Sequence, residues 1–234
     1  MSDVILEVFN LSKTFAEGDR QRLVFSNLNA SIRRGEFVVL LGRSGSGKST
    51  LLNLISGIDL PSGGEVRIGG RNLTGMTEQQ RTLFRRDHIG FVFQFYNLIP
   101  TLNVMENLLL PLELKKSLDA DSQRRALDIL QQVGLEDRSA SYPDRLSGGE
   151  QQRVAICRAL IHNPLVLLAD EPTGNLDAES GGEVLALLDQ LIRQNRMTAL
   201  MVTHSAEVAR LADRVITIKD GGLVETTAST EAVR

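Results

Sequence analysis

The segment EFVVLLGRSGSGKST, residues 36–50, decides the fold of this chain. Its first half is a short apolar run bounded by glycines, which is typical of a strand buried on both faces. Its second half fits the pattern G-x-x-x-x-G-K-[ST], and a helical sequence, STLLNLISGI, follows it. Strand, glycine-rich turn and helix in this order predict a phosphate-binding loop. A glycine-rich turn with a chance lysine is the alternative interpretation, and both flanks disfavour it.

Each part of this loop has its own expected role. Glycines let successive backbone N–H groups turn toward phosphate oxygens, and the N-terminus of the helix adds a partial positive charge. Lys48 is expected to reach the β- and γ-phosphates, and Ser49 is expected to bind Mg²⁺. The predicted nucleotide-binding residues here are Gly42, Arg43, Ser44, Gly45, Ser46, Gly47, Lys48, Ser49 and Thr50.

Further strands and helices alternate along the chain. Residues 164–170 (PLVLLAD) and 197–204 (MTALMVTH) are apolar runs of the same buried type as residues 36–41. This alternation predicts an α/β fold: a P-loop NTPase core with a mainly parallel sheet. Residues 5–15 and 23–32 alternate apolar and polar side chains, which predicts an N-terminal antiparallel β subdomain.

Residues from about 103 to 139 lack strand signals, and the helical stretch 95–160 is expected to form an insertion on the core. Within it, VMENLLLPLEL has helical periodicity that we expect to break at Pro111. The predicted organisation is therefore a single domain, 1–234, in which 1–94 and 161–234 form the nucleotide-binding core and 95–160 a helical subdomain. The chain is expected to close with a hairpin around Gly221 and Gly222.

Polar side chains at strand ends complete the predicted site. Asp170 and Glu171 end the run PLVLLADEP; Asp170 is expected to hold Mg²⁺ and Glu171 to polarise the attacking water. Gln94 ends IGFVFQ and is expected to contact Mg²⁺ or that water, while His204 follows ALMVT and is expected to contact the γ-phosphate. Each has a structural alternative as a solvated or polar strand-end residue. Ligands collect at strand ends in open α/β sheets, which favours the functional interpretation.

Composition excludes several classes of protein. The chain has 234 residues, a net charge of −3 and one cysteine, Cys157, so it has no internal disulfide and no generally basic surface for nucleic acid. We expect Cys157 to be a buried small hydrophobe. His88 and His162 are expected at the surface. No apolar run reaches the roughly 18 residues of a membrane span, and no signal peptide is evident, so we expect a cytosolic protein that reaches a membrane through a partner.

A second loop-to-helix junction, LSGGEQQRVAI at 146–156, has no obvious catalytic group. Ser147 and Glu150 form a capping box, which accounts for the helix start but not for Gly148 and Gly149. Glycines there would let a phosphate approach exposed N–H groups. The chain already has one phosphate loop, so we expect this junction to bind the γ-phosphate of a nucleotide held by a second copy.

Five motifs in order — GRSGSGKS, Gln94, LSGGE, LLADEP and His204 — resemble the ATP-binding-cassette ATPases over nearly the whole chain. The resemblance implies a head-to-tail dimer that sandwiches two ATP molecules with Mg²⁺. It also implies that Phe15 stacks on adenine, where tyrosine is commoner, and that Leu176 and Asp177 form a loop that crosses the dimer interface. Asp177 is equally suited to cap a helix.

QFYNLIPTLNVMENLLLPL and LADEPTGNLD resemble the subfamily that serves lipoprotein release, macrolide and peptide export, and cell division. This implies a separate membrane permease, met by residues 95–105 on the cytoplasmic face of the inner membrane. Phe95, Tyr96, Leu98 and Ile99 are instead buried if they belong to the helical core. A soluble ATPase of DNA repair or ribosomes, and an inactive binding module, are the other hypotheses. The absence of a coiled-coil insert and the presence of Lys48 and Glu171 disfavour them.

Overall fold

The computed structural model describes residues 3–18, 20–219 and 221–226. The chain divides into two compact units. The first unit holds the described residues up to 85 and from 192 onward, and the second holds residues 86–191. The boundaries between the units fall inside two helices, α2 (Glu78–His88) and α6 (Ala178–Gln194). Residues 86–88 of α2 belong to the second unit, and residues 192–194 of α6 belong to the first.

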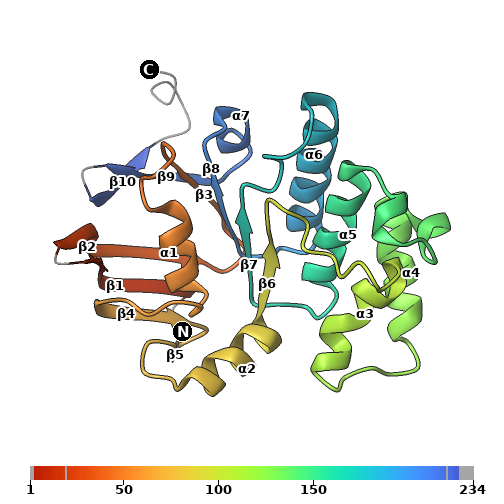
Figure 1. The fold of residues 1–234 in the computed structure, drawn as a ribbon, viewed down its shortest axis with the longest axis horizontal. Coiled ribbons are helices and arrows are strands. Elements are labelled where there is room, and N and C mark those ends of the chain that lie inside the picture. The colour runs from red at the N-terminus through yellow and green to blue at the C-terminus, as the bar shows by residue number, and fades with distance from the viewer. Residues whose placement is uncertain (1–2, 19, 220, 227–234) are drawn as a thin grey trace. The chain divides into compact units, whose positions relative to one another are not determined.

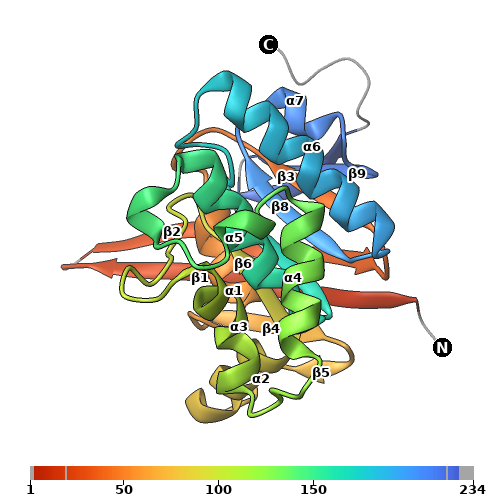
Figure 2. The ribbon, with the colours of Figure 1, turned by 90° about the vertical axis from the view of Figure 1, so that its right-hand side faces the viewer.

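The first unit contains an antiparallel sheet in the order β2-β1-β4-β5. Its long ribbon of β1 and β2 is seen in Figure 2. Buried Leu6, Val8 and Leu11 alternate with more exposed residues along β1, so one face of the sheet packs on a core, as the sequence predicts. The strands are β1 (Val4–Glu17), β2 (Arg20–Arg33), β4 (Gly63–Ile68) and β5 (Arg71–Asn72).

A second group of strands in this unit is mainly parallel. β3 (Phe37–Leu41) lies between β8 (Ala199–Thr203) and β9 (Arg214–Lys219) and pairs with both in parallel. β10 (Gly222–Thr226) is antiparallel to β9, so the predicted hairpin is confirmed. Leu41 pairs with Thr203, so both strands end at the same edge. The helices α1 (Lys48–Ile55) and α7 (Ala206–Ala209) follow these two strand ends (Figure 1).

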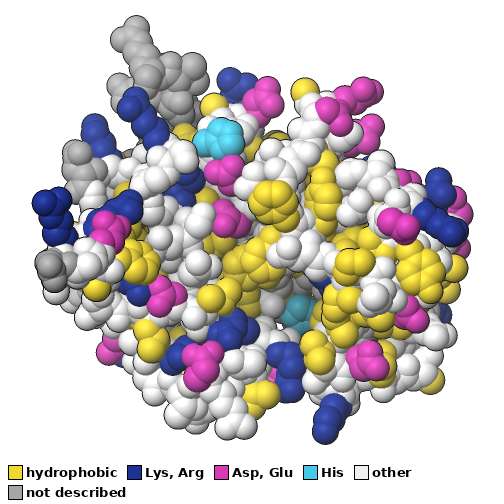
Figure 3. Space-filling view, in the orientation of Figure 1, with side chains coloured by type: hydrophobic (Ala, Val, Ile, Leu, Met, Phe, Trp, Pro, Cys, Tyr) yellow, Lys and Arg dark blue, Asp and Glu magenta, His cyan; other side chains and the backbone are white. Residues whose placement is uncertain are grey.

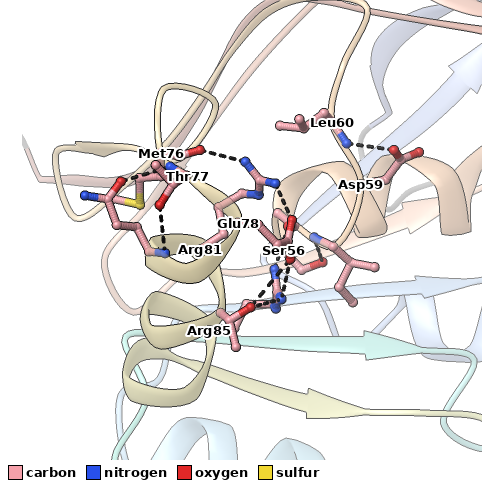
Figure 4. A network of polar contacts seen from close by, with 12 residues as sticks. Ser56, Asp59, Leu60, Met76, Thr77, Glu78, Arg81 and Arg85 are labelled. Carbon is pink, nitrogen blue, oxygen red and sulfur yellow. Dashed lines mark hydrogen bonds and ion pairs between the residues drawn. The ribbon is translucent and has the colours of Figure 1, made fainter.

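Two arginines of α2 belong to a polar network near its start, and one of them, Arg85, reaches the turn that follows α1 (Figure 4). Arg81 is 6% exposed, donates to the carbonyl oxygen of Met76 at 2.7 Å and forms an ion pair with Glu78. Arg85 donates to the carbonyl oxygen of Gly57 at 2.6 Å, just past the end of α1. A cation at a helix C-terminus is favourable because the last carbonyls carry partial negative charge. The buried residues of α2 are Arg81 and Phe84, so polar contacts hold this helix as well as apolar ones.

The second unit combines two parallel strands with helices. β6 (Ile89–Val92) pairs with β7 (Val166–Asp170), and Val92 lies opposite Ala169. The helices α3 (Val104–Leu114), α4 (Ser122–Gln132) and α5 (Gly148–Leu160) pack on one another (Figures 1 and 2). Short 3₁₀ turns at Glu136–Arg138 and Pro143–Arg145 lead from α4 into α5. The mainly parallel pairing and the antiparallel N-terminal sheet confirm the predicted α/β class.

The predicted break at Pro111 is wrong, because α3 runs through it to Leu114. Proline removes one backbone donor and costs a helix roughly 3 kcal/mol or more. Burial of Val104, Leu108 and Leu112 along one face of α3 offsets that cost. Tertiary packing contributes most of the stability of helices in proteins, and here it outweighs the local preference.

Candidate functional site

The predicted phosphate loop lies between the end of β3 and the start of α1. Lys48 is only 5% exposed, and its ammonium group donates to the carbonyl oxygens of Gly42 at 2.8 Å and Arg43 at 2.9 Å. The side chain thus folds across the loop that contains it. Gly47 has a φ of 94°, and a Cβ there would lie 2.7 Å from Cγ1 of Val24, so glycine is required twice over.

The loop fits a phosphate group. Gly47 is the N-cap of α1, and the first turn of the helix has no acidic residue. Gly47 has no side-chain acceptor to offer, unlike the Ser, Thr, Asp or Asn found at most helix starts. The buried hydroxyl of Ser46 also has no hydrogen-bond partner in the described part of the chain. Donors of this kind beside a buried lysine suit an anionic ligand.

Two further predicted residues belong to the first unit. His204 follows β8 and is exposed; because Leu41 pairs with Thr203, it starts from the same edge as the phosphate loop. Phe15, on β1, is 38% exposed. The ammonium of Lys13 lies 4.7 Å from the centroid of the Phe15 ring and forms a 2.7 Å ion pair with Asp59. The aromatic ring that we expect to stack on adenine is thus held beside a fixed cation.

In the second unit, the strand register brings Gln94 and the two acids to one edge. β6 ends at Val92 and β7 at Asp170, and Val92 pairs with Ala169, so Gln94 and Glu171 each follow a neighbouring strand. The Nε2 of Gln94 donates to the Oδ1 of Asn175 at 3.1 Å, and Asn175 Nδ2 donates to the carbonyl oxygen of Gln94 at 3.2 Å. The sequence predicts that this strand ends at Gln94, but β6 ends two residues earlier, at Val92.

The backbone of Glu171 is unusual. Its φ is 44°, in the left-handed region, and its carbonyl oxygen accepts from the N–H of Gly174 at 3.0 Å. A non-glycine residue in this region costs roughly 1–3 kcal/mol and is found where a site needs a particular side-chain direction. The turn after β7 thus aims Glu171 at the expense of local strain.

The capping box at the second junction is present. Ser147 Oγ accepts from the N–H of Glu150 at 3.2 Å, and Glu150 Oε2 accepts from the N–H of Ser147 at 2.7 Å. That backbone hydrogen bond is the main reason why the pKa of Glu150 lies below its ordinary value. The structure also gives a packing reason for Gly148, because a Cβ there would lie 2.7 Å from the hydroxyl oxygen of Tyr96. A Cβ at Gly149 would make only ordinary contact with Ser180, so packing does not require glycine there.

Asp177 caps α6. Its Oδ1 accepts from the N–H of Ser180 at 2.9 Å, and this hydrogen bond is the first cause of its lowered pKa. Asp177 is therefore a helix cap, which is one of the two roles expected for it. The other role, in a loop that crosses the dimer interface, stays a prediction.

One predicted surface residue is buried. His162 is 8% exposed, and its Nε2 lies 3.3 Å from the carbonyl oxygen of Ile89, so its assignment to the surface is wrong. Burial lowers its pKa, as expected for a group whose charged form loses solvation. The turn after α5 folds this residue back against β6, which helical periodicity does not reveal. Cys157 is fully buried, as predicted, and burial raises the pKa of its thiol to about 12.

Comparison with known proteins decides what these motifs belong to. The family model described as ABC transporter matches residues 25–174. The chain belongs to the ABC transporter family. Membership implies that it binds and hydrolyses ATP as the ATP-binding part of such a system.

Relatives and solved structures agree with this assignment. An uncharacterized ABC transporter ATP-binding protein of Mycobacterium tuberculosis is 54% identical over 94% of this chain and 89% of that one. The lipoprotein-releasing system ATP-binding protein LolD of Chromohalobacter salexigens is 44% identical over 96% of this chain and 94% of that one. A dimeric post-hydrolysis structure of the ATP-binding cassette MJ0796, with ADP and Pi, matches with a TM-score of 0.86 at 41% identity, covering 97% of this chain and all of that one.

The second unit of this ABC protein exposes several apolar side chains. Phe95, directly after Gln94, is 68% exposed, whereas Tyr96 and Leu98 are half-buried. Other exposed apolar residues belong to α3, to the segment after it and to α4: Leu114, Leu118 and Leu127. Figure 3 shows hydrophobic side chains gathered over the region of α3 and α4. Among the described residues, no helix combines the length and the apolar character that crossing a bilayer demands.

Two polar residues of this ABC protein were missed from the sequence. Asn175 pairs with Gln94, as described above. Gln152 is fully buried in α5. A signal for Gln152 exists, since the spacing to Ile156, Ala159 and Leu160 places it on the apolar face of the helix. A polar residue on that face predicts a specific buried hydrogen bond.

Proposed function

We propose that this chain is the ATPase subunit that drives a separate membrane permease. Two copies dimerise head to tail around two ATP molecules, and closure of the dimer moves the permease. The observation that supports ATP hydrolysis, and not merely ATP binding, lies in the second unit. There, the ends of paired β6 and β7 hold Gln94 and Glu171 at one edge, with Glu171 in a strained backbone conformation.

Each proposed residue has a chemical role. Lys48 and the N–H groups of the loop 42–50 bind the phosphates, Phe15 stacks on the base, and His204 contacts the γ-phosphate. Glu171 accepts a proton from the attacking water. Mg²⁺, when bound, neutralises phosphate charge, and Ser49, Gln94 and Asp170 are the residues that would hold it.

The dimer arrangement is supported by the junction at α5. Ser147, Gly148 and Gly149 of one copy are proposed to face the nucleotide held by the other, with Asp177 near the interface. The dimeric form in which MJ0796 was solved supports this arrangement. We also propose that residues 95–160 form a helical subdomain that moves when the dimer closes.

The permease interface is proposed to include residues 95–105. Phe95 is apolar, exposed and adjacent to Gln94 in the chain. A partner that covers Phe95 would therefore act on the position of Gln94, which is proposed to lie near the attacking water. The similarity to LolD supports export of a lipoprotein, and the subfamily resemblance keeps a macrolide or peptide as alternatives. Such a complex would place the chain on the cytoplasmic face of the inner membrane.

The test is Glu171→Gln, with Glu179→Gln as the matched control. Both remove one carboxylate in the same unit, but Glu179 lies exposed in the first turn of α6. Glu171→Gln should lower ATP turnover by about 10²-fold or more while ATP affinity is kept, and Glu179→Gln should leave turnover unchanged. Turnover by Glu171→Gln at the wild-type rate would remove Glu171 from its role.

The same Glu171→Gln protein, loaded with Mg-ATP, serves as bait on solubilised membranes. Recovery of an integral membrane protein is the expected result. Recovery of only ribosomal or DNA-associated proteins would contradict the transporter proposal and favour the soluble alternative.

A further inference from the structure

Gln152 joins three segments of the second unit that carry predicted site residues. It lies in the second turn of α5, three residues after Gly149, and is 0% exposed. Its Nε2 donates to the carbonyl oxygens of Phe93, at 3.2 Å, and Pro172, at 2.6 Å. Phe93 directly precedes Gln94, and Pro172 directly follows Glu171.

These two hydrogen bonds replace those of the sheet. β6 ends at Val92 and β7 at Asp170, so the carbonyl groups of Phe93 and Pro172 lie beyond the paired strands. The hydrogen bond to Pro172 is buried and that to Phe93 is partly buried. A carbonyl group removed from water without a donor is costly, so both favour the bridged arrangement. One amide group therefore fixes the separation of the segments that carry Gln94 and Glu171.

The same amide ties both segments to the start of α5. A helix is stiff over one turn, so Ser147–Gly149 and Gln152 move together. A shift of the helix start would pull on the carbonyls of Phe93 and Pro172. Gln152 Oε1 has no hydrogen-bond partner in the part of the chain that the structure describes. The amide is therefore held through its two donated bonds, without a third to fix it elsewhere.

We infer that Gln152 is a positioning residue through which each nucleotide site of the dimer controls the other. This rests on the proposed function. There, Ser147–Gly149 of a chain faces the nucleotide of its partner, whereas Gln94 and Glu171 of the same chain act on its own nucleotide. A phosphate bound at the start of α5 sets the position of Gln94 and Glu171 through Gln152. Hydrolysis at one site thus depends on occupancy of the other.

Gln151 provides a matched control from the same helix. Its Nε2 donates to the carbonyl oxygen of Leu146 at 3.1 Å, within the junction itself, and to neither strand end in the part of the chain that the structure describes. Gln151→Met and Gln152→Met replace the same side chain by one of similar length without donors. Only the second removes the bridge to Phe93 and Pro172.

The experiment measures the rate of ATP hydrolysis against ATP concentration. The wild type should show a Hill coefficient above 1. Gln152→Met should lower kcat by about tenfold, because both hydrogen bonds that position Gln94 and Glu171 are lost. It should change KM for ATP less than twofold and should bring the Hill coefficient to 1. Gln151→Met should keep both the kcat and the Hill coefficient of the wild type.

A second variant and a binding measurement separate positioning from loss of folding. Gln152→Asn keeps the amide but is one methylene shorter, and it should also lower kcat and the Hill coefficient; it decides the question if Gln152→Met does not fold. In the Glu171→Gln background, Gln152→Met should still form the ATP-dependent dimer, because Ser147–Gly149 is intact.

Three results would overturn the inference. These are an unchanged kcat and Hill coefficient in both Gln152 variants, an equal loss in Gln151→Met, or a Hill coefficient of 1 in the wild type. Failure of the proposed function is a separate result, seen when Glu171→Gln hydrolyses ATP like the wild type. If Glu171→Gln is inactive and the Gln152 variants match the wild type, only the inference fails.

Discussion

At the scale of single residues, the sites use side chains whose positions depend on one neighbour. Phe15 stands beside the ammonium of Lys13, and Gln94 is paired with Asn175. Gly47 and Glu171 both have positive φ values, but for opposite reasons. Glycine adopts that conformation without strain, whereas Glu171 is forced into it by the turn that follows β7.

Phe15 is expected to contribute binding energy through the base alone. Base stacking on an aromatic ring is worth about 1–3 kcal/mol by alanine substitution, so Phe15→Ala should weaken ATP binding by about 5- to 150-fold. Binding of inorganic tripolyphosphate should not change. Phe9→Ala is the control, since Phe9 is an exposed phenylalanine on the same strand.

The chain has no tryptophan, so Phe15→Trp adds a single fluorescent reporter. Its emission should change on addition of ATP and stay constant with tripolyphosphate. An equal loss of affinity for both ligands in Phe15→Ala would indicate a general effect on the loop, and would contradict stacking.

At the scale of elements, the helix starts divide into two kinds. α1 begins without a side-chain cap, whereas α3 and α5 each begin with a complete capping box. In α3, the cap Asn103 holds Glu106, and buried Asn107 ties the preceding loop through the N–H and carbonyl of Ile99. The segment proposed to meet the permease is thus fixed at its far end by one buried amide.

The cap of α5 gives a pH dependence. The backbone N–H of Ser147 keeps the pKa of Glu150 below its ordinary value of 4.5 in the folded chain. The stabilisation is therefore present above pH 4.5 and is lost as the pH falls through the lower folded-state pKa. Glu150→Gln keeps an acceptor oxygen but does not titrate.

Urea unfolding of the wild type and of Glu150→Gln over a pH series measures this effect. The wild type should be more stable near neutral pH, and its advantage should shrink below pH 4.5. A difference in unfolding free energy that stays constant across the series would show that Glu150 does not contribute by titration.

At the scale of the whole molecule, ATP is expected to control assembly. In the Glu171→Gln background, Mg-ATP should convert the monomer to a dimer, measured by sedimentation. Ser147→Arg should prevent this because a long side chain fills the junction. Ser147→Asp retains a good helix cap but places a negative charge against the γ-phosphate, so it should prevent dimerisation without unfolding α5.

Asn103→Asp is the control, because it adds the same charge at the capped start of α3. It should leave ATP-dependent dimerisation intact. Normal dimerisation of both Ser147 variants would count against a nucleotide site shared by two copies.

The sequence determined the candidate site residues and the order of elements. Local patterns predict the loop 42–50, the two acids at the end of β7, the capping box of Ser147 and Glu150, and the burial of Cys157. They do so because a cap, a turn or a buried strand involves residues close in sequence. Tertiary structure decided the rest. α3 continues through Pro111 because its buried face offsets the lost hydrogen bond, and His162 is buried because its turn folds against β6. Gln152 bridges Phe93 and Pro172, which are 59 and 20 residues away in the chain. The apolar face of α5 predicts that Gln152 is buried and hydrogen-bonded, but no local pattern identifies its partners, because they meet only when β6, β7 and α5 have packed.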